Sequence, residues 1–214
     1  MEAKSILLEL HHLPNIQYFT QIIDSEVVWI EAHENYLKQS LRNRCYILAA
    51  NKVDRLTIPV VHQKGVKIPI QEIQIDDSQK WQNKHWRAIQ SAYAHAPFFE
   101  YYSDYFKKVI FEPESSLFQL NLNLLKTCLE LLQIKKEIRL TNSFGVVDSE
   151  EKISDLRNTI QPNSETEIAF ENYQQVFGEQ FIPNLSILDL LFCEGPNASA
   201  ILRKQYLSLE NKAD

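Results

Sequence analysis

Two short apolar runs, separated by the length of one helix, constrain the fold of this chain most strongly. Residues 5–10 and 27–32 have the composition of buried strands, and Pro14 is well placed to begin a helix that ends near Ile23. A helix between two such strands makes a crossover, so the strands are expected to form a parallel pair. The loop after the first strand then lies at the sheet edge where ligands bind in folds of this kind.

The remaining chain divides into a part rich in strands and a helical part. Between residues 44 and 76, the runs CYILA, LTIPVV and PIQEIQI predict an antiparallel meander, with turns at residues 51–54 and near Gly65. Apolar periodicity and capping residues then predict a helix after Ser78, a helix from Pro97 and a helix over 115–133. A strand over 137–141, a helix over 148–158 and a loop over 162–166 are expected next. The chain is then expected to form a short helix capped by Asn184 or Ser186 and a last helix from Asn197.

These elements predict a single domain over residues 1–214 with an α+β fold, or an α/β fold. It would contain a mixed sheet with a parallel β-α-β start, an antiparallel meander and a helical second half. A chain of 214 residues with 44% hydrophobic residues can bury a sufficient core without disulfides. Cys45, Cys128 and Cys193 each stand in an apolar run and are expected to be core thiols.

Composition excludes several classes of function. The four glycines leave no glycine-rich loop for phosphate. A net charge of -6 argues against charge-driven binding to nucleic acid or to anionic membranes. No apolar stretch has the length of a membrane span or of a signal peptide, so the sequence predicts no membrane insertion and a cytoplasmic protein.

The segment WQNKHWRAIQSAYAHA, from Trp81, places a histidine on an apolar helix face. On a helical wheel His85 lies between Ala92 and Ala96 and points inward. A buried imidazole needs partners for its ring nitrogens, and burial disfavours its charged form. His85 is therefore either a core residue or a functional one, and the core interpretation is the commoner outcome for such a residue.

A cationic cluster follows the second expected strand. Lys38 and Arg44, with Arg42 beside them, can hold carboxylate or phosphate groups, and Tyr36 and Asn43 stand between them. A solvated loop is the alternative interpretation of such a cluster.

Three further polar residues interrupt apolar runs. Asp189 lies within SILDLLF, where an unpaired carboxylate would be costly, and structural and functional roles remain equally open for it. His11 and His12 end the first expected strand and point to opposite faces if extended, so no specific metal site is predicted.

The chain resembles the WbqC-like protein family over most of its length. The resemblance rests on the order of the segments PNIQYF, ENYLKQSLRNRC, LTIPV, WQNKHWRAIQSAYAHAPFFEYY, NLNLLKTCLELLQI and FIPNLSILDLLFCEGP. The positions that match the family's motifs are Tyr36, Lys38, Asn43, Arg44, His85, Trp86, Pro97 and Asp189. This chain departs from many relatives at Glu9-Leu10, where they have glutamine and proline, at Gln17, where they have glycine, and in the missing glycine-bearing segment within residues 142–180.

The resemblance implies a role in bacterial surface polysaccharide biosynthesis, such as that of O-antigen, with transfer of glycine or a similar acyl or aminoacyl group to an amino sugar. In this hypothesis His85 is the general base and Lys38 holds an anionic donor together with Arg44. Tyr36, Asn43, Trp86, Asp189 and His12 would contact a small-molecule substrate, such as a nucleotide sugar or an acyl donor. The cofactor and oligomeric state stay open.

The sequence is compatible with two other functions. One is a non-catalytic protein that binds or scaffolds a glycan intermediate, which the absence of a recognisable nucleophile favours. The other is a nucleotidyltransferase, suggested by the strand, histidine-bearing loop and helix at the start. That chemistry normally shows a His-x-Gly-His motif, and no glycine lies near His11 or His12.

Overall fold

A computed structural model of the chain describes residues 5–62, 65–145, 153–161 and 170–213. Its strands are β1 (Ser5–Glu9), β2 (Val27–Glu31), β3 (Arg44–Ala49), β4 (Lys52–Thr57), β5 (Glu137–Leu140) and β6 (Ile153–Asp155). Its α-helices are α1 (Ile16–Ile22), α2 (Trp81–Tyr93), α3 (Phe99–Phe111), α4 (Leu117–Leu131), α5 (Ile187–Glu194) and α6 (Ala198–Ala213). Short 3-10 helices are η1 (Ile70–Glu72), η2 (Asp77–Gln79) and η3 (Gly195–Asn197).

The parallel sheet has the strand order β5-β2-β1-β6, and each neighbouring pair is parallel. The predicted β-α-β start is confirmed, with Ser5 opposite Val27 and Glu9 opposite Glu31. Strands β2 and β5 extend the sheet on one side of β1, whereas β6 joins on the other side. The strand order therefore reverses between β1 and β6, and in such sheets a crevice forms beyond the carboxyl ends of the two strands.

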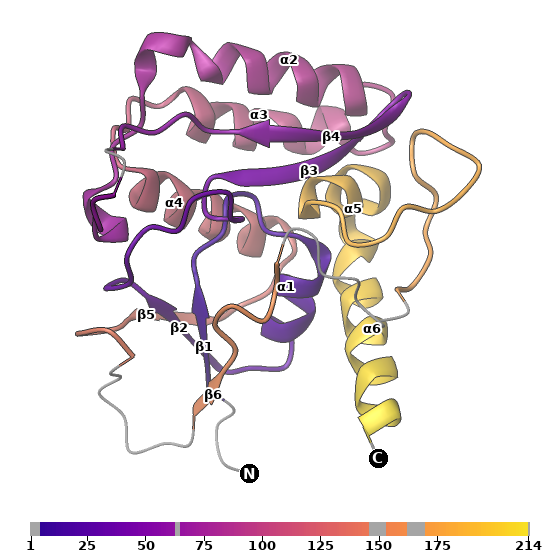
Figure 1. Cartoon of the computed structure of the whole chain (residues 1–214). Coiled ribbons are helices and arrows are strands. Elements are labelled where there is room, and N and C mark those ends of the chain that lie inside the picture. The colour runs from indigo at the N-terminus through magenta and orange to yellow at the C-terminus, as the bar shows by residue number, and fades with distance from the viewer. Residues whose placement is uncertain (1–4, 63–64, 146–152, 162–169, 214) are drawn as a thin grey trace.

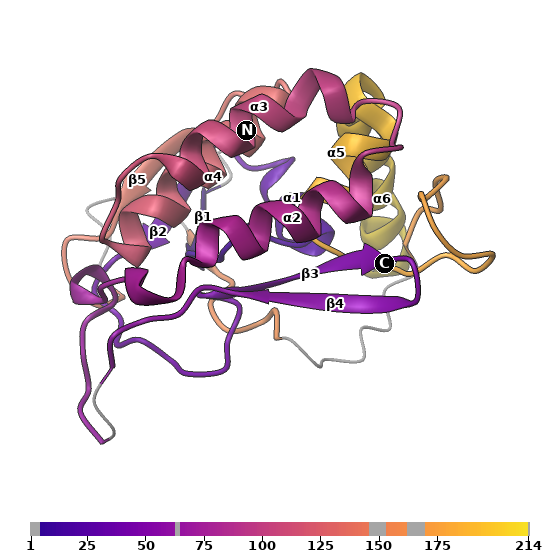
Figure 2. The same ribbon diagram turned by 90° about the horizontal axis from the view of Figure 1, so that it is seen from above.

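The hairpin β3-β4 forms a second, antiparallel sheet, with Arg44 opposite Thr57 and Ala49 opposite Lys52. In Figures 1 and 2 the hairpin lies along α2, with α3 on the other side of α2. Contacts join α2 to β3 and to α3, and α3 to α4, so these elements form one layered unit above the parallel sheet. The predicted α+β class is confirmed by this arrangement.

The main core lies between one face of the parallel sheet and the helices. Ile6, Leu8 and Ile30 project into this core, while Leu7 and Trp29 project from the opposite face into a small second cluster with Ile153. This alternation follows from the two-residue period of a strand. The thiols of Cys45, Cys128 and Cys193 are buried and free, as the sequence predicted.

The prediction of a third strand in the meander is wrong. Residues 70–72 form the 3-10 helix η1, and the segment after it makes only isolated bridges, such as Val60 with Ile75. Pro69 precedes η1 and cannot donate to a strand ladder. Ile70, Ile73 and Ile75 are all buried, and their uneven spacing does not fit one face of a strand.

The helix predicted over 148–158 is wrong where the structure describes it. Ile153–Asp155 is strand β6, and Asn158 has a left-handed backbone with φ of 60°. Pairing with β1, more than 140 residues earlier, overrides the weak helical pattern. Residues 148–152 and the predicted loop at 162–166 lie outside the described residues.

Several element boundaries differ from the prediction. Strand β4 begins at Lys52, so the hairpin turn is shorter than expected. Ser78 lies in η2, and Lys80 with φ of 47° precedes α2 instead. Helix α3 begins at Phe99, two residues after Pro97, and α6 begins at Ala198. Ser186, one of the two predicted caps, accepts from the Leu188 amide at the start of α5.

Candidate functional site

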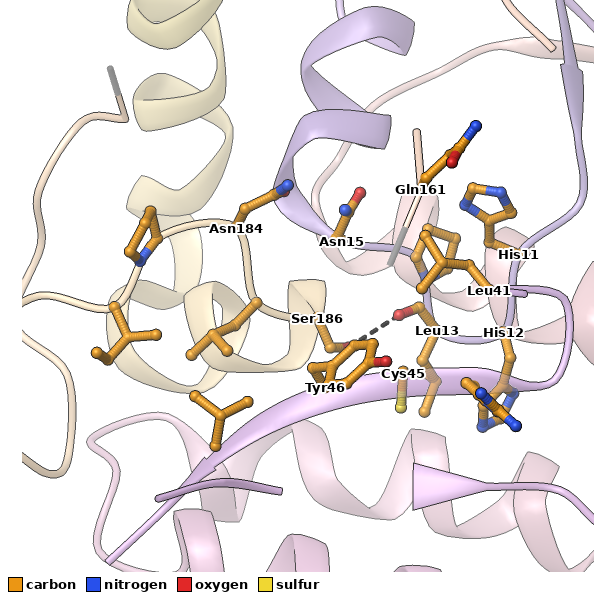
Figure 3. Close-up of a pocket in the computed structure, with 16 residues that line it drawn as sticks. His11, His12, Leu13, Asn15, Leu41, Cys45, Tyr46, Gln161, Asn184 and Ser186 are labelled. Atoms are coloured by element: carbon orange, nitrogen blue, oxygen red, sulfur yellow. Dashed lines mark hydrogen bonds between the residues drawn. The ribbon is translucent and has the colours of Figure 1, made fainter. Parts of the chain in front are cut away.

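A cavity of about 550 Å³ opens where the loops after β1 and β6 meet the segment before α5. It therefore lies at the reversal of strand order in the parallel sheet, the place where ligands bind in many α/β sheets. Figure 3 shows side chains from the loop after β1, from β3 and from the segment before α5 around it. The lining comprises His11, His12, Leu13, Pro14, Asn15, Leu41, Arg44, Cys45, Tyr46, Val53, Gln161, Ile182, Pro183, Asn184, Leu185 and Ser186.

His11 in this lining is oriented by a buried carboxylate. Its Nε2 donates to Glu9 Oε1 at 3.0 Å, and Glu9 Oε2 accepts from the Asn158 amide at 2.9 Å. Burial raises the pKa of Glu9, but the hydrogen bond and charge of His11 and the Asn158 amide outweigh burial and lower that pKa to about 2. The carboxylate is thus ionised, and Nδ1 of His11 has no partner among the described residues.

His12 is held in one tautomer by Asn121 of α4. The Asn121 Nδ2 donates to the Arg42 carbonyl at 2.7 Å, so its Oδ1 accepts from His12 Nδ1 at 3.0 Å. This leaves Nε2 of His12 as a bare acceptor with no partner in the described part of the chain. Burial, with a smaller effect from His85, lowers the pKa of His12 to about 3, so the ring is neutral.

His85 of α2 contacts His12, with ring centroids 5.7 Å apart. It lines a separate hollow of about 290 Å³ between β4 and α2, together with Thr57 and Lys84. Neither ring nitrogen makes a well-formed hydrogen bond within the described residues. Burial lowers the pKa of His85 to about 4, and the nearby Thr57 backbone offsets part of this effect.

Arg44 supplies the positive charge of the cavity from the first position of β3. It is half-buried, and its Nε has no partner in the described ranges. Asn43 donates to the Ile58 carbonyl at 2.8 Å, which fixes the start of the hairpin. Burial raises the pKa of the neighbouring Tyr36, and the charges of Arg44 and Arg42 oppose that rise.

The structure places His12 and Arg44 in the lining of one cavity, and His85 contacts the His12 ring from a neighbouring hollow. Thr57 pairs with Arg44 and lies beside the His85 ring. A guanidinium and neutral imidazoles in a half-enclosed space suit a small anionic ligand with hydrogen-bond donors.

Lys38 and Trp86 lie away from this cavity. Lys38 is exposed and lines none of the described hollows. Trp86 is buried against α3, where its ring stacks on Phe99 at a centroid distance of 6.4 Å and the Lys107 ammonium lies 5.8 Å from its ring centroid. These contacts give Trp86 a role in packing α2 on α3.

Asp189 also lies outside the cavity. Its side chain is fully buried in α5, where Oδ2 accepts from the Tyr173 hydroxyl at 2.6 Å and from Gln175 Nε2 at 2.8 Å. Burial raises the pKa of Asp189, and the hydrogen bonds from Tyr173, Gln175 and Tyr93 oppose that rise. The carboxylate thus ties the 173–175 segment to α5.

Sequence reasoning missed the pairing of Glu9 with His11. The signal was present, because residues two apart on a strand project to the same side, and a glutamate two before a histidine there can orient its ring. The role of Asn121 had no local signal, since it stands 109 residues from His12 along the chain. Within the described residues, no group of three or more histidine, cysteine, aspartate or glutamate side chains is arranged to hold a metal ion.

The comparisons with known proteins agree with the segments quoted above. No described helix is long and apolar enough to cross a membrane. The uncharacterized protein Rv1507c of Mycobacterium tuberculosis is 27% identical over 229 residues, which cover 94% of this chain and 97% of the relative. No solved structure matches the chain. The model of the WbqC-like protein family matches residues 11–167 and 163–201, and the chain belongs to this family.

Proposed function

We propose that this chain is a cytoplasmic group transferase that moves an acyl or aminoacyl group, such as glycine, onto an amine or hydroxyl of a sugar. The setting would be the biosynthesis of a bacterial surface polysaccharide such as O-antigen. The observation that carries the proposal is the Glu9-His11 pair in the wall of a cavity that also contains Arg44. An imidazole held by a carboxylate is a general base in a fixed orientation.

The base in this proposal is His11 and not His85. A general base works best when its pKa lies near the working pH, and burial lowers the pKa of His85 to about 4. His12, whose pKa is lowered to about 3, is a still weaker base. The Glu9 carboxylate, by contrast, stabilises the imidazolium that forms when His11 takes up a proton.

The reaction would follow ordinary acyl transfer from a thioester or another activated acyl donor. The acceptor nitrogen or oxygen attacks the acyl carbon and forms the new bond, while Nδ1 of His11 takes the proton from the acceptor. The bond from the acyl carbon to the leaving sulfur or oxygen then breaks, and the proton passes to that atom. Arg44 holds a carboxylate or phosphate of the donor or of a nucleotide sugar. Tyr36 and Asn43 keep the arginine loop in place.

A non-catalytic binding protein of the same pathway is the second candidate. The neutral, weakly basic rings of His12 and His85 favour it, because such rings accept hydrogen bonds from a ligand without transferring protons. Nucleotidyl transfer has less support, since Leu13 and Pro14 follow the histidine pair in place of a glycine-bearing motif.

The test is a product assay with acyl thioesters and amino sugars, read by mass spectrometry on the wild type, His11→Gln and Arg44→Ala. We expect His11→Gln to lower turnover by about 100-fold or more, because removal of a general base costs about that factor. His95→Gln, at an exposed histidine just after the end of α2, is the matched control. Ligand binding without product in the wild type would support the binding protein, and full turnover in a folded His11→Gln variant would refute the assignment.

A further inference from the structure

The main cavity continues into a second hollow at the tip of the β3-β4 hairpin. This hollow has a volume of about 430 Å³ and lies between residues 48–53 and the segment 177–182. Val53 and Ile182 line both hollows, so the two spaces share a wall on each side. The two adjacent hollows extend from His11 and Arg44 to the hairpin tip, and together they are called the groove below.

Strand β3 forms the floor of this groove and changes character along it. Arg44, Tyr46 and Leu48 are two residues apart, so their side chains share one face of the strand. The groove therefore passes from a guanidinium to a phenol ring to an aliphatic side chain. Four residues of strand span about 13 Å between the first and the last of these positions.

The far half of the groove is walled by apolar side chains that the protein leaves partly open. Val53 stands opposite Leu48 in the hairpin and is 39% exposed. Phe177 and Ile182 are half-buried on the other wall. Lys52 and Glu179 also line this half, and both are exposed. The end of the groove at Arg44 thus favours an anionic or polar group of a ligand, and the end at Val53 favours an apolar chain.

We propose that the group transferred is a linear aliphatic acyl chain of medium length, with its carbonyl end at His11 and Arg44 and its chain along β3 to Val53 and Phe177. This inference rests on the proposed acyl transfer and names an aliphatic acyl donor in place of the glycine donor given there as an example. The bonds made and broken are those of that reaction. The groove length of about 13 Å limits the chain that can be fully buried.

The test is the affinity of the full-length protein for free carboxylates of increasing chain length, from acetate to decanoate, measured by calorimetry. We expect the dissociation constant to fall about fourfold per added methylene, since each buried methylene contributes about 0.8 kcal/mol, until the groove is full. Val53→Asp is expected to flatten this dependence, because it places a charged side chain against the apolar chain of the longer carboxylates. Val61→Asp, at a valine 60% exposed outside both hollows, should keep the wild-type dependence.

The outcomes separate this inference from the proposed function. If carboxylates of every length bind with the same affinity, and lose affinity in Arg44→Ala, the proposed acyl chain is refuted. The anion site at Arg44 is then still supported. A chain-length dependence that persists in Val53→Asp would also overturn the placement of the chain. Failure of every carboxylate to bind would contradict both the inference and the anion site at Arg44.

Discussion

The carboxyl group of Asp189 illustrates how one buried acidic side chain can organise a wall of the site from a distance. It accepts from Tyr173 and Gln175, and Gln175 in turn bonds to both the amide and the carbonyl of Ile182. Ile182 lines the cavity and the groove. The aspartate therefore fixes the position of the wall without touching a ligand.

We expect Asp189→Asn to lower the free energy of unfolding by about 2 kcal/mol, because the amide replaces one acceptor with a donor and a buried polar group left unpaired costs about 1–3 kcal/mol. Urea unfolding at pH 7.5 measures this loss, with Asp104→Asn on the exposed side of α3 as the control. Unchanged stability combined with lost carboxylate binding would instead make Asp189 a ligand-binding residue.

Individual site residues were predictable to the extent that their signals were local. Arg44 and His85 stood out through charge and through burial on a helix face, and Glu9 with His11 could have been found from their spacing on a strand. The tautomer of His12 depends on Asn121, which α4 brings from far along the chain. His12 and Asn121 are 109 residues apart, so no local sequence pattern contains both of them.

Among the elements, the junction of α5, η3 and α3 depends on one glycine. Gly195 has φ of 52°, and a Cβ there would lie 2.4 Å from Cδ1 of Phe98, whose ring stacks on Tyr102 and cannot move freely. The end of α5 and the residue before α3 can approach this closely only because the side chain is absent. The Phe98 amide also donates to the Phe192 carbonyl at 2.9 Å, which joins the two helices.

We expect Gly195→Ala to lower the free energy of unfolding by about 3 kcal/mol, from the steric overlap and the left-handed backbone together. In a Phe98→Ala background the same substitution should cost only about 1 kcal/mol, because the overlap is gone. Gly178→Ala is the matched control, since its backbone is also left-handed but its Cβ would have only an ordinary contact at 3.6 Å. Equal costs at Gly195 in both backgrounds would contradict the steric explanation.

Elements with a strong local pattern formed as predicted, and those that depend on distant partners did not. Helix α4 carries a wide apolar stripe, and β1, α1 and β2 show the expected alternation of strand and helix. Strand β6 is only three residues long and exists because β1 pairs with it. The run PIQEIQI has the composition of a strand, but Pro69 and the uneven isoleucine spacing lead it into a 3-10 turn.

At the scale of the whole molecule, the site lies where the parallel sheet meets the layer of hairpin and helices. His12 comes from the loop after β1 and His85 from α2, and their rings meet in the core between the two parts. Both rings are neutral when the protein is folded and would be charged in acid when it is unfolded. The pH dependence of the free energy of unfolding should therefore reveal the protonation state of these two rings.

The sign of the pH dependence follows from the lowered pKa values. Above pH 6.5 both histidines are neutral in the folded and unfolded states and contribute nothing to the pH dependence. Below pH 6.5 the unfolded chain binds protons that the folded protein does not, until the pH reaches about 4 for His85 and about 3 for His12. Stability is thus lost as the pH falls through this window. Glu9, whose pKa is lowered to about 2, adds a further loss only below about pH 4.5.

We therefore expect the free energy of unfolding to fall by about 1 kcal/mol per pH unit for each of these histidines between pH 6.5 and pH 5. His85→Leu should remove one of the two contributions and cost little at pH 7.5, because it also removes two buried nitrogens that lack partners in the described structure. Urea unfolding at half-unit steps from pH 7.5 to pH 5 measures the slope, and His95→Gln, at an exposed histidine, should leave it unchanged. The free energy of unfolding of His85→Leu could instead depend on pH as steeply as that of the wild type. That result would show that the His85 ring is already charged in the folded protein, or freely hydrated. It would remove the physical reason for assigning the general base to His11 and not to His85.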